Sequence, residues 1–576
     1  MRVAHTNSLI EKRTFQFICF AGIFVTFVVT PFTNFDPINL GKAMCLALAS
    51  FGVLGLAISN VDIFLDKIPR SILIVVGLFV SWMILSSVFS EAPIQQQLWG
   101  VWGRNTGILS YISLSLILLA SSSLTEKYLI KKLLLVLIWT SIAQTAYMII
   151  QTFGLDPIKW SRKEAFGTLG NINFSSSFLG ICSSVLVSYL LFAPRNLAIK
   201  TLVVVSIFAN VVLTWRTGSI QGPGILAIST SLILGIWLWF KRKKFILLAY
   251  IIAISIAGSI GFLGLLNRGP LAKVLFQETL VYRWDYWTAG FNMTLLRPLF
   301  GLGMDSYGDW YRAERTIEAT IRTGPDRISN SAHNIFLDIS SGGGIPLLVL
   351  YLTIIFLSLR SGISFLKVLG TSKDLQFQSW QHIGILGALI AYLAQCLISI
   401  NQIGVGVWGW VLTGLLIASS KQIENEDKFS DKSHNAKAKT AKAGRKSSNE
   451  QLLPAKSALA VISGMAIGVF LTWFPLNADM KFRSAQNSRD IKQMVASLDS
   501  TGITAFHYEN VIQSAIQANL SEVVKDLNPR LTRTYPRDFY GWLVMSRLTA
   551  ISDKDRNFAI AKLRLLDPHN PQIPNG

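Results

Sequence analysis

The stretch "KTLVVVSIFANVVLTWRTGSIQGPGILAISTSLILGIWLWFKRKK" (residues 200–244) decides the fold. It contains two apolar runs, at 199–215 and 218–240, and each is long enough to cross a bilayer as a helix, which takes roughly 17 to 25 residues. A short polar turn separates them, and the basic block "KRKK" ends the second. Because clusters of Lys and Arg remain on the cytoplasmic side, the stretch predicts two antiparallel membrane-spanning helices whose connecting turn lies on the outer face.

The rest of the chain repeats this pattern. Hydrophobic residues make up 51% of the 576 residues and charged residues 15%, which is far from the balance of a soluble domain. We therefore expect an all-α polytopic membrane protein with about 12 to 13 transmembrane helices. The expected spans are 15–32, 38–59, 71–90, 107–123, 129–153, 174–194, 199–215, 218–240, 245–265, 345–367, 380–400, 403–420 and 456–476.

The charges indicate topology rather than a nucleic-acid partner. The net charge is +21, but the basic residues lie in short clusters between apolar runs. If the N-terminus is cytoplasmic, these clusters all fall on the cytoplasmic side, and the outer face then receives 91–106, 154–173, the long loop 266–344 and the C-terminal segment. The four cysteines lie within apolar runs and show no CxxC or Cys/His spacing, so neither a disulfide framework nor a zinc site is indicated.

Four regions follow from this reading. Residues 1–420 form a transmembrane domain with the large outer loop 266–344. Residues 421–455 are polar, rich in lysine and of low complexity, which predicts a disordered cytoplasmic linker. Residues 456–476 are the last span, and residues 477–576 read as successive short amphipathic helices on the outer side. These helices resemble tetratricopeptide repeats, and a plain helical cap is the alternative.

Three ionisable residues beside the outer face are the candidates for chemistry. Arg216 ends a span at a depth where a guanidinium is costly unless it is paired or solvated. Arg283 precedes an amphipathic segment rich in aromatic residues. The alternative for Arg216 is a side chain that extends to the membrane interface and serves only topology, and the alternative for Arg283 is contact with lipid headgroups. His333 is the only imidazole in the outer loops of the membrane domain, on a short helix expected to be capped by Ser331. A hydrogen-bonded structural histidine is the alternative.

Two arginines and a neutral base at a bilayer surface suit one reaction, the transfer of a sugar chain from a polyprenyl diphosphate lipid to a hydroxyl. Arginine binds phosphate oxygens in a fork and can stabilise the diphosphate leaving group. An imidazole with a pKa near neutrality can take the proton of the attacking hydroxyl. The outer segments contain no DxD-like carboxylate pair or histidine cluster, so we expect the arginines to act in place of a metal and no cofactor to be needed.

With these residues in place, the sequence resembles the O-antigen ligase family, which shares its domain with O-antigen polymerases and O-linked oligosaccharyltransferases. The resemblance spans about residues 90 to 420 and rests on five motifs in the family's order. They are "WGVWGRNTGILSY", "FGTLGNINFSSSFL", "WRTGS", "RWDYWTAG" with "RPLFGLG", and "SAHNIFLDISSGGGIPLLVLY". One departure is Trp215, which precedes Arg216 where many members have serine.

This resemblance implies a fold of the GT-C type and an inverting, metal-independent transfer from an undecaprenyl-diphosphate-linked glycan. The implied catalytic residues are Arg216, Arg283 and His333. Arg104 and Asn171 are implied in donor binding or loop organisation, and Asn334, which forms the HN motif with His333, is implied in substrate binding. The C-terminal helices are similar to extensions in some members and would engage a glycan or a protein acceptor.

Several functions remain open at this point. A ligase would use a lipid A core or similar glycolipid as acceptor, a polymerase a second lipid-linked repeat unit, and an oligosaccharyltransferase a protein hydroxyl. A bicarbonate or other solute transporter would need ionisable residues along a path through the spans, where the sequence offers almost none. A purely structural membrane protein is the last alternative. The diphosphate lipid implies a multi-pass protein of a cell inner membrane, with a cytoplasmic N-terminus and with the site and the C-terminus in the periplasm.

Overall fold

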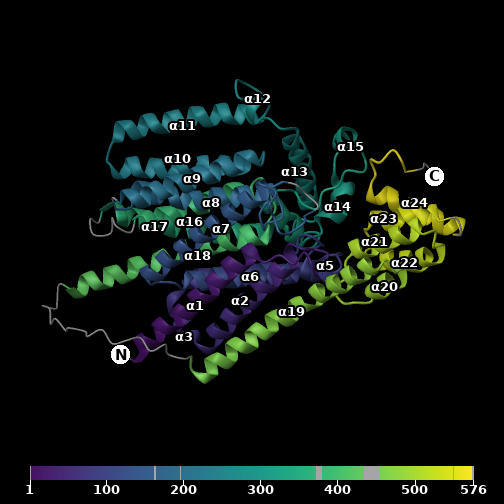
Figure 1. The fold of residues 1–576 in the computed structure, drawn as a ribbon, viewed down its shortest axis with the longest axis horizontal. Coiled ribbons are helices and arrows are strands. Elements are labelled where there is room, and N and C mark those ends of the chain that lie inside the picture. The colour runs from purple at the N-terminus through teal and green to yellow at the C-terminus, as the bar shows by residue number, and fades with distance from the viewer. Residues whose placement is uncertain are drawn as a thin grey trace.

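The protein is built from helices. The computed structural model describes residues 2–160, 164–194, 196–371, 379–433, 453–548 and 551–573, and every regular element within these ranges is a helix. Figure 1 shows long helices lying side by side, with a group of short helices from the C-terminal region gathered at one end of the bundle. The expected all-α class is therefore confirmed.

Each expected span coincides with a long helix. Among the described residues, 9 helices are long and apolar enough to cross a membrane by length and composition. The protein is thus a multi-pass membrane protein. The helices that coincide with the expected spans, including those outside this set of 9, are α1 (Arg2–Phe27), α2 (Asn39–Ser59), α4 (Arg70–Phe89), α6 (Ile108–Ser122), α7 (Lys127–Thr152), α8 (Ile172–Phe192), α9 (Leu197–Arg216), α10 (Gln221–Phe240), α11 (Lys244–Leu265), α16 (Ile335–Thr371), α17 (Ser379–Cys396), α18 (Ile403–Ser433) and α19 (Ala455–Ser488).

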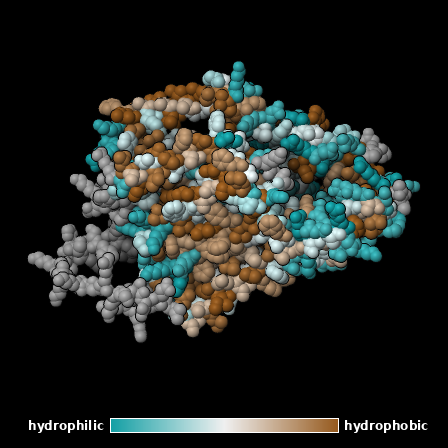
Figure 2. Space-filling view, in the orientation of Figure 1, coloured by the Kyte–Doolittle hydropathy of each residue, from teal (hydrophilic) through white to brown (hydrophobic). Residues whose placement is uncertain are grey.

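Short helices occupy the segments between the long ones. The expected outer loop 266–344 is largely helical, and the C-terminal segment contains the expected run of short helices. Figure 2 shows mostly apolar side chains over the bundle and mainly polar ones over the end where the short C-terminal helices gather. The short helices of the whole molecule are α3 (Val61–Lys67), α5 (Ile94–Trp99), α12 (Ala272–Leu275), α13 (Glu278–Leu296), α14 (Tyr307–Glu314), α15 (Ile317–Thr323), α20 (Ile491–Ser497), α21 (Ala505–Gln517), α22 (Ser521–Thr534), α23 (Phe539–Arg547) and α24 (Asp553–Leu566).

Glycines bring α19 against α2, although the two helices are far apart in sequence. A Cβ atom on Gly468 would meet the backbone carbonyl of Ala47, and one on Gly464 would meet that of Phe51. Small residues allow membrane helices to approach this closely and to gain van der Waals contact where lipid supplies no hydrophobic driving force. This contact fixes the start of the C-terminal segment to the membrane domain.

The helix ends differ from the expected boundaries. α16 begins at Ile335, before the expected 345, and kinks at Gly344, whose φ of 79° is not helical. α19 continues past 476 to Ser488, because its last turns bury Phe482 in the core of the C-terminal helices. α18 runs to Ser433 and so covers the beginning of the expected linker, while 434–452 lie outside the described residues.

Candidate functional site

His333 lies in the turn that leads into α16. Its backbone is left-handed, with φ 52°, and the helix begins only two residues later. The side-chain oxygen of Asn334 accepts hydrogen bonds from two backbone N–H groups of the first turn, at 3.0 and 3.3 Å. The expectation that Ser331 caps a helix carrying His333 was therefore wrong. Asn334 is the cap, and the imidazole projects from the turn before the helix.

Asp338 holds this turn in place. Its carboxylate accepts a hydrogen bond from the backbone N–H of Ala332 at 2.8 Å and another from the Ser331 hydroxyl at 2.6 Å. The Ser331 oxygen in turn accepts from the backbone N–H of His333 at 3.0 Å. A positive φ in a residue other than glycine costs about 1 to 3 kcal/mol and persists only where neighbours fix it. The conformation of His333 is thus imposed by Asp338 and its partners.

The imidazole of His333 is uncharged at neutral pH. It is half-buried and stacks on the ring of Tyr286, with centroids 5.5 Å apart and an interplanar angle of 27°. Burial, and to a smaller extent the positive charges of Arg283 and Arg104, lower the pKa of His333 to about 4. This pKa lies below the near-neutral value that the sequence suggested, because the imidazole is partly removed from water and two guanidinium groups act on it. The ring is therefore in its base form.

Arg283 supplies a positive charge without a carboxylate partner. It lies on α13, is half-buried, and makes no hydrogen bond or ion pair with any residue in the described ranges. Burial lowers the pKa of Arg283, while the neighbouring Tyr286 raises it. The nearby Asp285 instead binds Arg322, at 2.6 Å. An uncompensated guanidinium beside a neutral imidazole can bind an anion such as a diphosphate.

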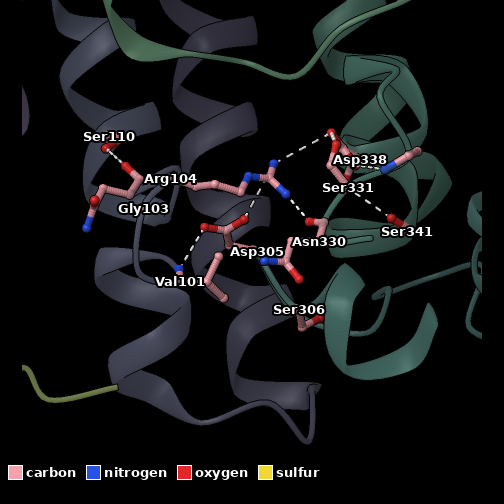
Figure 3. A network of polar contacts seen from close by, with 12 residues as sticks. Val101, Gly103, Arg104, Ser110, Asp305, Ser306, Asn330, Ser331, Asp338 and Ser341 are labelled. Atoms are coloured by element: carbon pink, nitrogen blue, oxygen red, sulfur yellow. Dashed lines mark hydrogen bonds and ion pairs between the residues drawn. The ribbon is translucent and has the colours of Figure 1, made fainter. Parts of the chain in front are cut away.

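Arg104, by contrast, is enclosed by acceptors (Figure 3). One of its terminal nitrogens lies 3.7 Å from Asp305 and 3.8 Å from Asp338, and the other donates to the backbone carbonyl of Asn330. Asp305 also accepts from the backbone N–H of Val101 at 2.9 Å. Arg104 thus ties three chain segments together. This contact pattern favours loop organisation for Arg104, and its part in donor binding stays a prediction.

A small polar cavity of about 20 Å³ lies beside the Arg104 network. Thr106 and Asn401 line it, and the side-chain oxygen of each lacks a hydrogen-bond partner among the described residues. A cavity of this size and polarity suits a single water molecule and is too small for a sugar.

Arg216 lies at the end of α9 with an exposed side chain. In the part of the chain that the structure describes, it makes no hydrogen bond or ion pair. The following turn is fixed, since the Ser219 hydroxyl donates to Asn173 at 2.8 Å. Figure 1 shows this α9–α10 turn at the same end of the bundle as α13. Among the described residues, no contact joins Arg216 to Arg283 or to His333. Of the three expected catalytic residues, Arg283 and His333 are linked by the effect of the Arg283 charge on the pKa of His333.

Asn171 is a helix cap. Its side-chain oxygen accepts a hydrogen bond from the backbone N–H of Asn173 at 2.8 Å, at the start of α8. Asn173 receives the Ser219 hydroxyl, so Asn171 acts on the α9–α10 turn through the beginning of α8. This contact accounts for an asparagine at this position, and its role in binding substrate stays a prediction.

Sequence reasoning missed the carboxylates of the site. Asp305 and Asp338 are single acidic residues in unremarkable surroundings, and neither belongs to a spacing typical of a site. The only local signal was the position of Asp338 in the first turn of a helix, where a carboxylate interacts favourably with the helix dipole. Within the described ranges, no group of three or more His, Cys, Asp and Glu side chains is placed to hold a metal ion.

The comparisons with known proteins agree with the motifs. No curated protein matches the chain. The family model described as O-antigen ligase matches residues 218–352, which include Arg283, His333 and the beginning of α16. Arg104, Asn171 and Arg216 lie before the matched residues. Residues 218–352 thus match an O-antigen ligase domain, which confirms the suspected resemblance for this part of the chain and supports, in general terms, a glycosyltransferase of the O-antigen ligase and polymerase type.

Proposed function

We propose that this protein transfers a glycan from an undecaprenyl-diphosphate-linked donor to the hydroxyl of a glycolipid such as a lipid A core. The reaction would take place at the periplasmic face of an inner membrane, with inversion at the anomeric carbon and without a metal ion. The O-antigen ligase domain supports the class of reaction, and the surroundings of His333 support this mechanism.

One observation carries the proposal: a neutral imidazole stands beside a guanidinium that no carboxylate neutralises. The low pKa of His333 keeps the ring in its base form. Arg283 is half-buried, has no ion-pair partner among the described residues and lies close enough to lower that pKa. Removal of a charged group from water is costly without a counter-charge. A diphosphate would supply that counter-charge, so the site favours a substrate with this group.

The transfer step follows from these roles. The acceptor hydroxyl attacks the anomeric carbon opposite the diphosphate, and the bond from that carbon to the diphosphate oxygen breaks as the new glycosidic bond forms. The hydroxyl proton passes to the imidazole of His333. Undecaprenyl diphosphate leaves with the bonding electrons, and Arg283, together with Arg216 at the α9–α10 turn, stabilises its negative charge.

Donor binding would also change the base. Burial and, beside it, the two positive charges of Arg283 and Arg104 depress the pKa of His333 in the free protein. A diphosphate bound to Arg283 would offset them and raise this pKa, because a nearby negative charge favours the imidazolium. The imidazole would then be a stronger base in the complex, at the moment when the acceptor hydroxyl must lose its proton.

Glycan transfer by the purified full chain tests the proposal. The donor is a synthetic undecaprenyl-diphosphate oligosaccharide, and the acceptors are a lipid A core glycolipid, a second lipid-linked repeat unit and a peptide with serine and threonine. Each reaction runs with and without EDTA. We expect transfer that survives EDTA and falls by about 10² to 10⁴-fold in His333→Ala, the range of a lost general base.

His382→Ala is the matched control, because His382 is also a buried imidazole, bound to the carbonyl of Gly362 at the opposite end of α16. Equal loss in both variants would show that removing any buried imidazole harms the protein, and full activity of His333→Ala would remove His333 from the mechanism. Loss of transfer in EDTA would contradict the metal-independent step. The acceptor that gains glycan separates a ligase from a polymerase and from an oligosaccharyltransferase.

A further inference from the structure

A buried ion pair joins the C-terminal helices to the outer loop. Both carboxylate oxygens of Asp567, which follows α24, accept hydrogen bonds from one nitrogen of Arg315 at 2.8 Å. The side chains of Arg315 and Asp567 are both 0% exposed. Arg312 reaches the same carboxylate at 3.0 Å. A buried guanidinium needs such a partner, because a single buried charge is strongly unfavourable.

The same arginines fix the segment that follows α15. Arg315 donates to the backbone carbonyl of Arg327 at 3.0 Å and to that of Pro325 at 3.1 Å. Arg312 also donates to the carbonyl of Pro325, at 2.6 Å. Asp567 therefore anchors two arginines that hold the loop from α14 to residue 327.

The C-terminal helices grip α14 at a second point. The guanidinium of Arg537 lies 3.3 Å from the ring centroid of Trp310, and its Nε donates to the backbone carbonyl of Asp309 at 3.2 Å. Arg312 lies over the ring of Phe539, 4.2 Å from its centroid. These contacts involve side chains of α14 and of the segment around α23, so the docking does not rest on the ion pair alone.

A continuous series of side-chain contacts leads from Asp567 to His333. Arg315 lies over the ring of Tyr311, 5.9 Å from its centroid. Tyr311 packs edge to face on Tyr286, with centroids 5.6 Å apart, and Tyr286 stacks on the imidazole of His333 at 5.5 Å. The Tyr311 and Tyr286 side chains are both buried, so movement of one must displace the next.

We propose that Asp567 is a positioning residue for His333: the C-terminal helices complete the outer site by clamping α14, and through it the tyrosine stack on which the imidazole rests. In this proposal the C-terminal helices act by positioning a residue of the site, whereas the family resemblance implied that they engage an acceptor. Only its effect on glycan transfer rests on the proposed function, because the contact between the clamp and the imidazole can be measured without a substrate.

Chemical modification of His333 tests this directly. Diethyl pyrocarbonate reacts with accessible imidazoles, and mass spectrometry of the peptides gives a rate for each histidine in the full chain. We expect the rate at His333 to rise by about tenfold in Asp567→Asn, because loss of the counter-charge of two buried arginines favours local opening of the clamp. The buried His382 lies on α17 and contacts the carbonyl of Gly362, far along α16 from His333. It serves as the internal reference, and its modification rate should not change.

Two further variants protect the test against simple unfolding. Tyr311→Leu removes the middle ring of the stack and leaves the Asp567 ion pair, so His333 should react faster there too. Asp499→Asn removes an exposed ion pair with Arg530, whose side chains are 68% and 36% exposed, and should leave His333 unchanged. If both His333 and the reference His382 react faster in Asp567→Asn, that variant is unfolded. The rate at His333 in Tyr311→Leu then decides whether the tyrosine stack positions the imidazole.

An unchanged rate at His333 in Tyr311→Leu, or in a folded Asp567→Asn, would overturn the proposal. In glycan transfer we expect Asp567→Asn to lower kcat by about tenfold with little change in the KM for donor, because the base is displaced while Arg283 remains. Asp567→Glu should recover part of this loss. If the wild type transfers no glycan, the proposed function fails, whereas the modification rates still decide the clamp.

Discussion

The arginines at the outer end of this molecule fall into two groups. Arg104 and Arg315 are enclosed by carboxylates and backbone carbonyls and connect segments that are distant in sequence. Arg283 and Arg216 have no hydrogen-bond or ion-pair partner in the described portion of the chain, and only Arg283 is partly buried. A guanidinium already neutralised by carboxylates has little attraction left for a phosphate. Arg104 and Arg315 are therefore neutralised structural residues, whereas Arg283 and Arg216, which lack such partners among the described residues, are the arginines that the proposed function assigns to an anionic donor.

The largest expected effect comes from removing Arg283, the partly buried arginine without a partner among the described residues. We expect Arg283→Ala to lower kcat/KM for glycan transfer by about 10² to 10³-fold, the loss typical of one stabilising donor at a developing anion. The melting temperature should not fall, because no ion pair is lost. Arg283→Lys should recover part of the activity, since it restores charge without the planar fork. Transfer within twofold of the wild type would contradict the assignment.

The second prediction concerns Arg104, one of the arginines that are enclosed by acceptors. Arg104→Ala should destabilise the protein by about 3 kcal/mol, because it leaves two carboxylates without their cation. Thermal unfolding of the purified protein measures this, and the additional change Asp305→Asn should recover part of the loss, as a double-mutant cycle requires for a coupled pair. Unchanged stability together with weaker donor binding would move Arg104 into the anion-binding group.

The third prediction concerns Arg216, the exposed arginine without a partner among the described residues. Arg216→Ala should raise the KM for donor by about tenfold or less, since an exposed charge is screened by solvent and salt. Repeating the measurement at high ionic strength should shrink the difference between variant and wild type. A change in kcat with an unchanged KM would instead place Arg216 at the developing charge of the transition state.

The fourth and smallest effect is on the pH profile. In the proposed mechanism His333 acts unprotonated, so we expect activity to be lost as the pH falls through its pKa. The acid limb of kcat/KM reports the free protein and should lie near the depressed value of about 4. The acid limb of the kcat profile reports the complex of the protein with its donor. It should lie at higher pH, because the bound diphosphate offsets the positive charges of Arg283 and Arg104. Coincident limbs would show that the anion does not reach the imidazole.

The sequence predicted the helices well because the bilayer demands long apolar runs, and each expected span coincides with a helix. It predicted the helix ends less well. α16 starts before its apolar stretch because Asn334 caps it, and α19 extends beyond its own because Phe482 packs against the C-terminal helices. Both ends depend on hydrogen bonds and tertiary contacts that hydropathy does not record.

The candidate residues of the site could be proposed from the sequence, whereas the residues that hold them in place could not. His333 and Arg283 stood out because charged and imidazole groups are rare at the outer face. The acceptors of Arg104 and Arg315 did not, because Asp305 and Asp567 are single carboxylates more than 200 residues away from their partners, without a local pattern. Sequence reasoning therefore left Arg104 open between donor binding and loop organisation, and its contacts with Asp305, Asp338 and the Asn330 carbonyl favour loop organisation.

The most direct test of the account is a titration of His333 itself. NMR of the protein labelled with ¹⁵N-histidine, with His333→Ala for assignment, gives the imidazole pKa with and without undecaprenyl diphosphate. We predict a pKa of about 4 in the free protein and a rise when the diphosphate binds. A pKa of about 6.5, the value of an unperturbed histidine, that does not change with the diphosphate would contradict a neutral base set between two arginines and facing an anionic donor.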